Sequence, residues 1–389
     1  MGARVFFPGH ITRRDFVGAA LLLAARHGSA AAAPLRIGLV LSPAASSASI
    51  ERGAEQGLAE AQIFAGLLGK SIELVKRQVA SSREAFDAGL KLFREERVCA
   101  LVGGSDEVAA HALARAAERA TGLFVNVGAA SSRLRDEHCG GRSLHVAPGV
   151  DAQVEAAGLW LAEDQGRTRW AVVAGEHPFG EDVARAVQRR SASVRAQIVV
   201  TAAPPPGGNW DGLWRRLEEA RPDAVWLGLL PEQLSGFQHE TLPAGAELVG
   251  VAPDAWGPGA GAWGVWPLAW HASLRRFSAA ELNRRFRARF GQAQDGAAWA
   301  AWAGTKLLAE AGVRSGQADP TALLAFVAKK LAFDGHKGAP LLFSPVHRQL
   351  RQPLYLVRYE DGSVRDKVAA EIGLDRLATH EGSVCGGKA

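Results

Sequence analysis

Two glycine-containing loops are the segments best suited to hold a small ligand. They are Gly103-Gly104-Ser105-Asp106 and Gly128-Ala129-Ala130-Ser131, and each follows an apolar run typical of a buried strand. In open α/β sheets, ligands sit beyond the carboxyl ends of the strands, where loops lead into helix N-termini whose unpaired N–H groups attract anions. Glycine lets the backbone approach a ligand, and Ser131 can donate or accept a hydrogen bond. Serine and aspartate are also the usual N-caps of helices, so a purely structural role stays open.

Signatures of catalysis are missing from the sequence. It contains neither a Gly-x-Ser-x-Gly elbow nor a His-Glu-x-x-His pair. Gly69-Lys70-Ser71 matches the end of a P-loop, but the first glycine of that motif would fall at Phe64, and the segment follows a helix rather than a strand. The 11 histidines are scattered without the spacing of metal ligands. We therefore expect no catalytic residue, metal or cofactor, and a periplasmic enzyme is the weaker alternative.

The first 33 residues read as an export signal. The pair Arg13-Arg14 precedes Phe16, an apolar run follows at 17–25, and small residues close the segment at 29–33. This order is that of a twin-arginine signal peptide. The apolar run is about half of the roughly 20 residues that a membrane span needs. We therefore expect a periplasmic protein that is not inserted in the membrane after processing.

Composition agrees with a soluble, two-domain product. The full chain carries a formal charge of +5, but removal of residues 1–33 leaves 41 basic and 39 acidic residues, a charge of +2. No basic block with interleaved aromatic residues occurs, so we expect no nucleic-acid partner. About 355 mature residues are too many for one core and suit two domains.

The cysteines leave the redox state open. Cys99, Cys139 and Cys385 form no Cys-x-x-Cys pair, which argues against a metal or thioredoxin-like motif. An oxidising compartment permits one disulfide. Cys99 and Cys139 both lie near expected strand ends of the first domain and are the better pair, although free thiols fit equally well. The count is odd, so at least one thiol stays unpaired or pairs outside the chain.

Short apolar runs alternate with amphipathic segments along the mature chain. Such alternation predicts parallel sheets covered by helices on both faces. The pattern restarts near residue 150, which predicts an α/β protein of two Rossmann-like lobes. The expected strands are 35–41, 71–75, 99–104, 123–127, 169–174, 196–200, 224–228, 341–343 and 353–358. The expected helices are 50–67, 82–96, 108–120, 152–163, 180–190, 210–220, 279–290 and 297–311.

The order of several stretches resembles the type I periplasmic binding proteins of the branched-chain amino-acid and amide receptor family, the Leu/Ile/Val-binding-like receptors of ABC transporters. The stretches are 35–40, 53–59 with Gly69-Lys70, 100–105, 126–130, 145–149 and 178–181. The resemblance implies two lobes joined by a three-crossing hinge, which close on a small solute and deliver it to the permease subunits of an importer. The same fold also serves as the ligand-sensing subunit of membrane receptors, so that use stays open.

The restarted strand–helix pattern and the returning C-terminal strands imply domain limits. The first lobe takes 35–147 plus 271–343 and the second takes 148–270 plus 344–375. Residues 376–389 form a C-terminal tail. Crossings are expected near Pro148, Trp270 and Pro345.

The C-terminal third resembles a narrower subgroup. Its stretches 297–302, 333–338 and 349–354 are similar to receptors encoded beside pyrroloquinoline-quinone-dependent alcohol dehydrogenases. The likeness implies a link to alcohol oxidation and does not make the chain a quinone enzyme.

The resemblance places the ligand between the lobes. The binding residues it implies are Ser105, Asp106, Ala129 and Ser131 in the first lobe and Phe179 and Asp254 in the second. Phe179 falls where the family carries an aromatic ring that stacks on the ligand. Asp254 falls near an acid that pairs with a ligand ammonium group.

The sequence departs from the amino-acid receptors at two places. Leu229 and Leu230 stand where those receptors carry aromatic residues, and Asp106 stands near a position usually held by serine. A carboxylate there would repel a ligand carboxylate, so a less polar or cationic solute fits better than an α-amino acid. The tryptophans at 256, 263, 266 and 270 would form either a lobe core or a wall of the cleft.

Changing both Arg13 and Arg14 to lysine should leave the precursor in the cytoplasm, because the twin-arginine route reads this pair. Fractionation followed by immunoblotting measures the periplasmic yield. A variant that reaches the periplasm at the wild-type level would contradict the predicted route.

Overall fold

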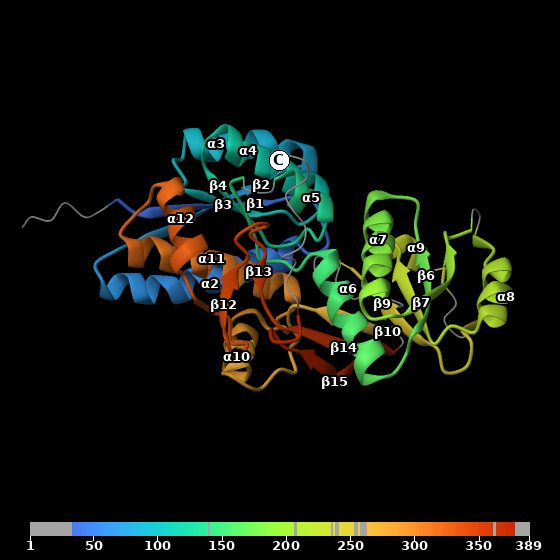
Figure 1. Cartoon of the computed structure of the whole chain (residues 1–389). Coiled ribbons are helices and arrows are strands. Elements are labelled where there is room, and N and C mark those ends of the chain that lie inside the picture. Colours follow the sequence, from blue (N-terminus) through green and yellow to red (C-terminus); the bar gives the residue numbers. More distant parts are fainter. Residues whose placement is uncertain are drawn as a thin grey trace, which may run out of the picture.

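The computed structural model describes residues 33–138, 141–205, 208–234, 236–237, 241–252, 256, 263–360 and 363–377. Within them, two α/β lobes lie side by side and are joined by a hinge (Figure 1). The predicted fold class is confirmed. The signal peptide, Cys139, Asp254 and Cys385 lie outside the described residues.

The first lobe is built on a five-stranded parallel sheet in the order β2-β1-β3-β4-β5. Its central strands are buried on both faces, which explains their nearly continuous apolar sequences. Helices α3 and α4 cover one face, and α2 and α11 cover the other (Figure 1). The elements are β1 (Leu35–Leu41), α2 (Ser47–Leu67), β2 (Ile72–Gln78), η1 (Ser82–Glu84), α3 (Ala85–Arg94), β3 (Ala100–Gly103), α4 (Glu107–Arg119), β4 (Leu123–Asn126), α5 (Ser132–Glu137) and β5 (Ser143–His145).

The second lobe contains a seven-stranded sheet in the order β15-β14-β10-β9-β8-β6-β7. The strands from β10 to β7 are parallel, whereas β14 and β15 run antiparallel at one edge. Only two residues separate β14 from β15, too few for a parallel crossover, so this edge departs from the expected parallel arrangement. The elements are α6 (Val150–Leu159), η2 (Trp160–Asp164), β6 (Arg169–Ala174), α7 (Pro178–Ser193), β7 (Gln197–Ala202), α8 (Asp211–Ala220), β8 (Ala224–Gly228), α9 (Pro231–Leu234), β9 (Glu247–Gly250), β10 (Gly264–Leu268), β14 (Leu354–Glu360) and β15 (Ser363–Ile372).

Between β10 and β14 the chain returns to the first lobe. Its helix α11 packs along α2, whose Gly53 and Gly57 leave no room for a Cβ against the backbone of α11. The short strand β13 pairs with β12, so residues 344–351 stay bonded to this returning segment before the chain enters β14. The exact lobe limits stay a prediction. The returning elements are α10 (Ala279–Phe290), α11 (Gly296–Ser315), α12 (Pro320–Lys330), β11 (Phe333–Asp334), β12 (Pro340–Phe343) and β13 (Leu350–Arg351).

A buried lysine joins the segments that run between the lobes. Lys337 is 2% exposed, and its ammonium group donates to the carbonyl of Ala269 after β10 and to the carbonyl of Pro353 before β14 (3.1 Å). It also donates to Gln352 Oε1 (2.7 Å), whose amide group donates to the carbonyl of Val146 after β5 (2.7 Å). One cation and one amide thus bond to all three stretches that link the sheets in the described residues.

A buried arginine connects the hinge to the loop that follows β4. Arg135 donates to the carbonyls of Ala129 (3.3 Å) and Ser131 (2.9 Å) in that loop. It also donates to the carbonyl of Ala147 (2.7 Å) and to Gln349 Oε1 (2.8 Å), which lie beside the crossings. Burial lowers the pKa of Arg135 to about 10, and the guanidinium donates to four neutral oxygen atoms among the described residues.

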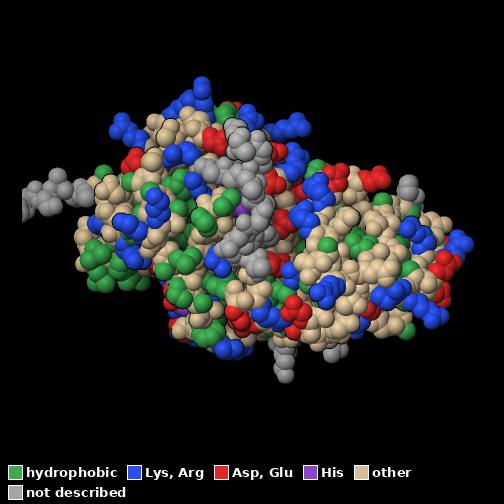
Figure 2. Space-filling model, viewed as in Figure 1, with side chains coloured by type: hydrophobic (Ala, Val, Ile, Leu, Met, Phe, Trp, Pro, Cys, Tyr) green, Lys and Arg blue, Asp and Glu red, His purple; other side chains and the backbone are tan. Residues whose placement is uncertain are grey.

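The molecular surface mixes both signs of charge on the face shown in Figure 2, with basic and acidic side chains interspersed. Exposed apolar side chains gather near the end of α2. They are Ile63, Phe64, Leu67 and Leu68. Among the described residues, no helix combines the length and apolarity that crossing a bilayer requires.

Replacing Lys337 by methionine should lower the free energy of unfolding by about 2–4 kcal/mol. The apolar chain still packs, but Gln352 and the carbonyls of Ala269 and Pro353 lose their donor, at roughly 1–3 kcal/mol for each buried group left unsatisfied. Urea unfolding measures the change. The control is Lys329→Met on the exposed side of α12, which should change stability by less than about 0.5 kcal/mol. Equal stability of the two variants would show that the hinge does not depend on this cation.

Candidate functional site

The loops after β1, β3 and β4 meet at the carboxyl edge of the first sheet. These strands are paired in parallel, with Gly103 opposite Asn126. A Cβ on Gly128 would lie 2.5 Å from the carbonyl oxygen of Gly104 and 2.9 Å from the Cα of Ser105. The two predicted loops therefore pack backbone against backbone, and the structure brings Ser105, Asp106, Ala129 and Ser131 to one edge.

Asp106 is the N-cap of α4. Its Oδ1 accepts from the backbone N–H of Ala109 (2.9 Å). Its Oδ2 accepts from the hydroxyls of Ser82 (2.6 Å) and Ser42 (3.1 Å). Ser42 also hydrogen-bonds to Ser105. Since the proton of Ser42 goes to Asp106, the bond between the two serines takes the proton of Ser105. The carboxylate thus occupies the positive end of α4 and organises three serines around it.

Ser131 caps α5 and contacts α4. Its hydroxyl oxygen accepts from the backbone N–H of Leu134 (3.4 Å), and its proton goes to Glu107 Oε1 (3.0 Å). Glu107 also faces His111. The nearby imidazole of His111 and the hydrogen bond from Ser131 hold the pKa of Glu107 below its usual value, although burial acts in the opposite direction. Both Asp106 and Ser131 therefore have the capping role that the sequence left open.

Ala129 contributes backbone groups rather than a side chain. Its N–H donates to Asn126 Oδ1 (3.0 Å), and its carbonyl accepts from Asn126 Nδ2 (2.7 Å) and from Arg135. These contacts hold the loop after β4 in a single shape and connect it to the hinge. Asn126 ends strand β4 and is fully buried.

In the second lobe, Phe179 lies in the first turn of α7. It is 7% exposed, and its ring meets Trp256 edge to face at 4.7 Å and lies parallel to His177 at 6.2 Å. His177 caps α7 by accepting from the backbone N–H of Gly180 (3.1 Å). Asp254, the second residue expected from this lobe, lies outside the described residues. The roles of Phe179 and Asp254 toward a ligand stay predictions.

The lobes touch where α7 meets α5. Asp182, one turn after Phe179, accepts from the backbone N–H of Ser132 (2.8 Å), the residue that follows Ser131. The Ser132 hydroxyl donates to Asp151 Oδ2 (3.1 Å). Burial raises the pKa of Asp182, against the lowering effect of the Ser132 backbone N–H and of Arg185. This contact brings the Phe179 turn of the second lobe to the Ser131 loop of the first.

Sequence reasoning missed several of these groups. Ser42 follows the first strand, and a search for polar residues at every strand end would have found it. Ser82, Glu107 and Asp182 lie in or next to helices and carry no local signal, because their partners are 24 to 50 residues away.

The tryptophans of this cluster that the structure describes lie in or against the lobe cores. Trp270 stacks on Trp299 with ring centroids 5.8 Å apart and donates to Asn283 (2.9 Å), and it is fully buried in the first-lobe core. Trp266 packs against Tyr359 within the second lobe. Both are core residues, and Trp256 is a partly buried ring that packs against the second-lobe core, where it contacts Phe179.

Cys99 is a buried free thiol, and burial raises its pKa to about 12. It is therefore an unreactive core residue at ordinary pH. Its predicted partner Cys139 lies outside the described residues, so the disulfide stays a prediction.

These two α/β lobes, joined by a hinge, agree with a family model described as periplasmic binding protein, which matches residues 34–363. The chain belongs to this family. Members of the periplasmic binding protein family and the solved structures below are solute-binding proteins. No curated protein matches the chain.

Solved periplasmic binding proteins share the fold at low sequence identity. A branched-chain amino-acid ABC transporter ligand-binding protein from Burkholderia xenovorans is 15% identical, with a TM-score of 0.76, over 88% of this chain and 96% of that one. A substrate-binding protein from Sphaerobacter thermophilus is 21% identical, with a TM-score of 0.72, over 88% and 98%. A solute-binding protein from Rhodopseudomonas palustris, in complex with 3,4-dihydroxybenzoic acid, is 19% identical, with a TM-score of 0.68, over 88% and 98%.

Gly128→Ala should destabilise this periplasmic binding protein by about 1–3 kcal/mol, because the new methyl group must push the two loops apart. Gly212→Ala is the matched control, since nothing lies within 4 Å of its Cβ and alanine favours a helix. Thermal and urea unfolding give both values. A Gly128→Ala protein as stable as the Gly212→Ala protein would show that the loops do not pack as described.

Proposed function

We propose that this protein is an exported solute receptor that closes on a small hydrogen-bond-donating or cationic solute and delivers it to the permease of an ABC importer. The family supports the solute-binding part of this proposal. The importer, the periplasmic location, the twin-arginine export and the alcohol-oxidation subgroup rest on the sequence patterns described above.

The class of ligand is inferred from the acceptors to which the serine hydroxyls donate their protons. Ser42 and Ser82 donate to Asp106, and Ser131 donates to Glu107. The hydroxyl of Ser105 is hydrogen-bonded to the hydroxyl of Ser42. A hydroxyl has one proton and two lone pairs, so these side chains offer a ligand acceptors rather than donors. A ligand carboxylate, which can only accept, finds little to bind among them.

The carboxylates around these loops favour the same class of ligand. The N-terminus of α4, where an anionic ligand would be attracted, already holds the carboxylate of Asp106. Across the lobe contact, Asp182 takes the first N–H of α5. Together with Glu107, these carboxylates favour solutes with hydroxyl or ammonium groups. They disfavour α-amino acids, whose carboxylate would approach Asp106.

The contact between α5 and α7 supplies the closing surfaces. Phe179 and Asp182 lie one helical turn apart and share a face of α7, and Asp182 reaches the loop that carries Ser131. A solute held by that loop would therefore meet the aromatic ring of Phe179. Closure removes the solute from water, which strengthens each hydrogen bond in the site.

Phe179→Ala should weaken binding about tenfold or more. Loss of a buried aromatic surface costs roughly 1–3 kcal/mol, and about 1.4 kcal/mol corresponds to tenfold. A thermal-shift screen of alcohols, aldehydes, organic cations, carboxylic acids and α-amino acids identifies the ligand, and calorimetry then measures its affinity for both proteins. Phe64→Ala on the exposed end of α2 is the aromatic control.

Equal affinity of Phe179→Ala and wild type would show that the ring does not contact the solute. A hit confined to α-amino acids or other carboxylates would overturn the proposed ligand class. Uptake of the labelled solute in a deletion strain decides between transport and sensing, since importer function requires that uptake be lost.

A further inference from the structure

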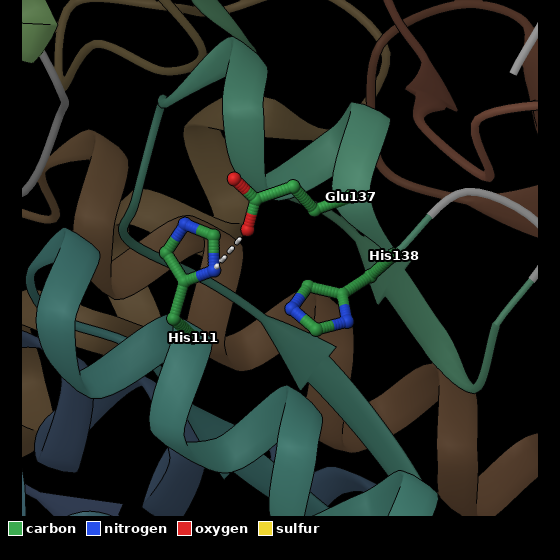
Figure 3. A group of neighbouring side chains, drawn as sticks. All are labelled: His111, Glu137 and His138. Carbon is green, nitrogen blue, oxygen red and sulfur yellow. Dashed lines mark ion pairs between the residues drawn. The ribbon is translucent and has the colours of Figure 1, made fainter. Parts of the chain in front are cut away.

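Two histidines and a glutamate converge between α4 and the end of α5. His111 lies in α4, Glu137 ends α5, and His138 is the C-cap of α5. One possible ligand atom from each lies within 4.8 Å of the others. Figure 3 shows the three side chains turned toward one another. No local spacing links the members of this group, because His111 and Glu137 are 26 positions apart in the sequence.

The hydrogen bonding of His138 leaves one ring nitrogen available to a metal ion. Its side chain is 8% exposed, and Nδ1 lies 2.7 Å from Glu118 Oε1. Because a carboxylate accepts hydrogen bonds, this contact places the proton on Nδ1 and leaves the lone pair on Nε2. Nε2 is buried and has no hydrogen-bond partner among the described residues. A carboxylate behind a histidine is the usual arrangement at metal sites, where it fixes the tautomer and raises the basicity of the ligand.

His111 also lies beside two carboxylates. Its Nε2 is buried and lies 3.7 Å from Glu107 Oε1, and its Nδ1 lies 3.5 Å from Glu137 Oε2. Neither distance is that of a good hydrogen bond, so Nδ1 and the Glu137 carboxylate face each other without a direct bond that a metal ion would have to break. Their separation is close to the roughly 3.4 Å expected between two ligands that each bind a tetrahedral Zn²⁺ at about 2.0–2.1 Å.

We propose that His111, Glu137 and His138 bind one divalent transition-metal ion of the Zn²⁺ class. Two imidazoles and one carboxylate form a ligand set suited to Zn²⁺ rather than to Ca²⁺ or Mg²⁺, which prefer oxygen ligands. Glu137 is half-exposed, so its side chain can move toward the ion and water can take a fourth position.

The ion would fasten α5 to α4 directly behind the ligand loop. Glu107 contacts His111 on one side and accepts from Ser131 on the other. The metal ligands and the predicted solute site therefore share this carboxylate. Metal binding would hold the capped end of α5, and with it Ser131, in place before a solute arrives.

Isothermal calorimetry with Zn²⁺ tests the proposal on the mature chain, purified without a histidine tag and stripped with a chelator. We expect one Zn²⁺ per chain with a dissociation constant below ~10 µM. Ca²⁺ at the same concentration should not bind. Glu137→Gln and His138→Gln should each weaken Zn²⁺ binding at least tenfold. Glu118→Gln, a positioning change, should weaken it by about 10–100-fold.

Two controls locate the ion. His336→Gln removes a half-buried histidine that follows β11 and should bind Zn²⁺ as wild type does. Cys139→Ser removes the thiol that follows His138 in the sequence and should also leave affinity unchanged. The Zn²⁺-induced rise in melting temperature should disappear in Glu137→Gln, whose exposed position preserves the fold if His138→Gln does not fold.

Three results would overturn the proposal. The first is uptake of much less than one Zn²⁺ by the wild type. The second is undiminished binding by Glu137→Gln, and the third is loss of binding in Cys139→Ser, which would assign the metal to a thiol site.

Discussion

The structure depends on how the crossings between the lobes satisfy their backbone. These segments run between two sheets and cannot use either ladder, so their buried carbonyls need donors from elsewhere. Lys337 and Gln352 supply them, and the Lys337 ammonium also lies 4.0 Å from the ring centroid of Trp299. A buried charge is costly unless its hydrogen bonds are satisfied. Lys337 offsets part of this cost because its single ammonium group reaches carbonyls on two different crossings.

Arg135 extends the same arrangement to the binding loop. Its guanidinium bonds to Ala129 and Ser131 on one side and to Ala147 and Gln349 on the other. The loop that would hold a solute and the segments that would rotate during closure therefore share one rigid group. Movement of the lobes must either carry this loop along or exchange these hydrogen bonds, and either course makes the shape of the site depend on the hinge.

The parts of the fold that could be predicted are those with local causes. Buried parallel strands have nearly continuous apolar sequences, and amphipathic helices have apolar residues at helical spacing. The lobes and the loops at the strand ends could therefore be predicted from the sequence. The antiparallel β15 at the sheet edge, the cation at the hinge and the contact of Asp182 with Ser132 did not. Each depends on partners that are close only after folding. His111 and His138 are the same case, since no spacing links them.

The choice between cap and binding residue, which the sequence left open for Asp106 and Ser131, is not exclusive. A cap uses part of the hydrogen-bonding capacity of a side chain and fixes its position. Ser131 accepts from Leu134 and donates to Glu107, which leaves one lone pair of its hydroxyl, and Asp106 holds two loops and a helix with three donors. Side chains that are already held in place lose little conformational freedom when a solute binds. More of the free energy of each new contact therefore contributes to affinity. The bonds that make these residues structural therefore also make them suitable for recognition, and they restrict that recognition to partners that bring their own protons.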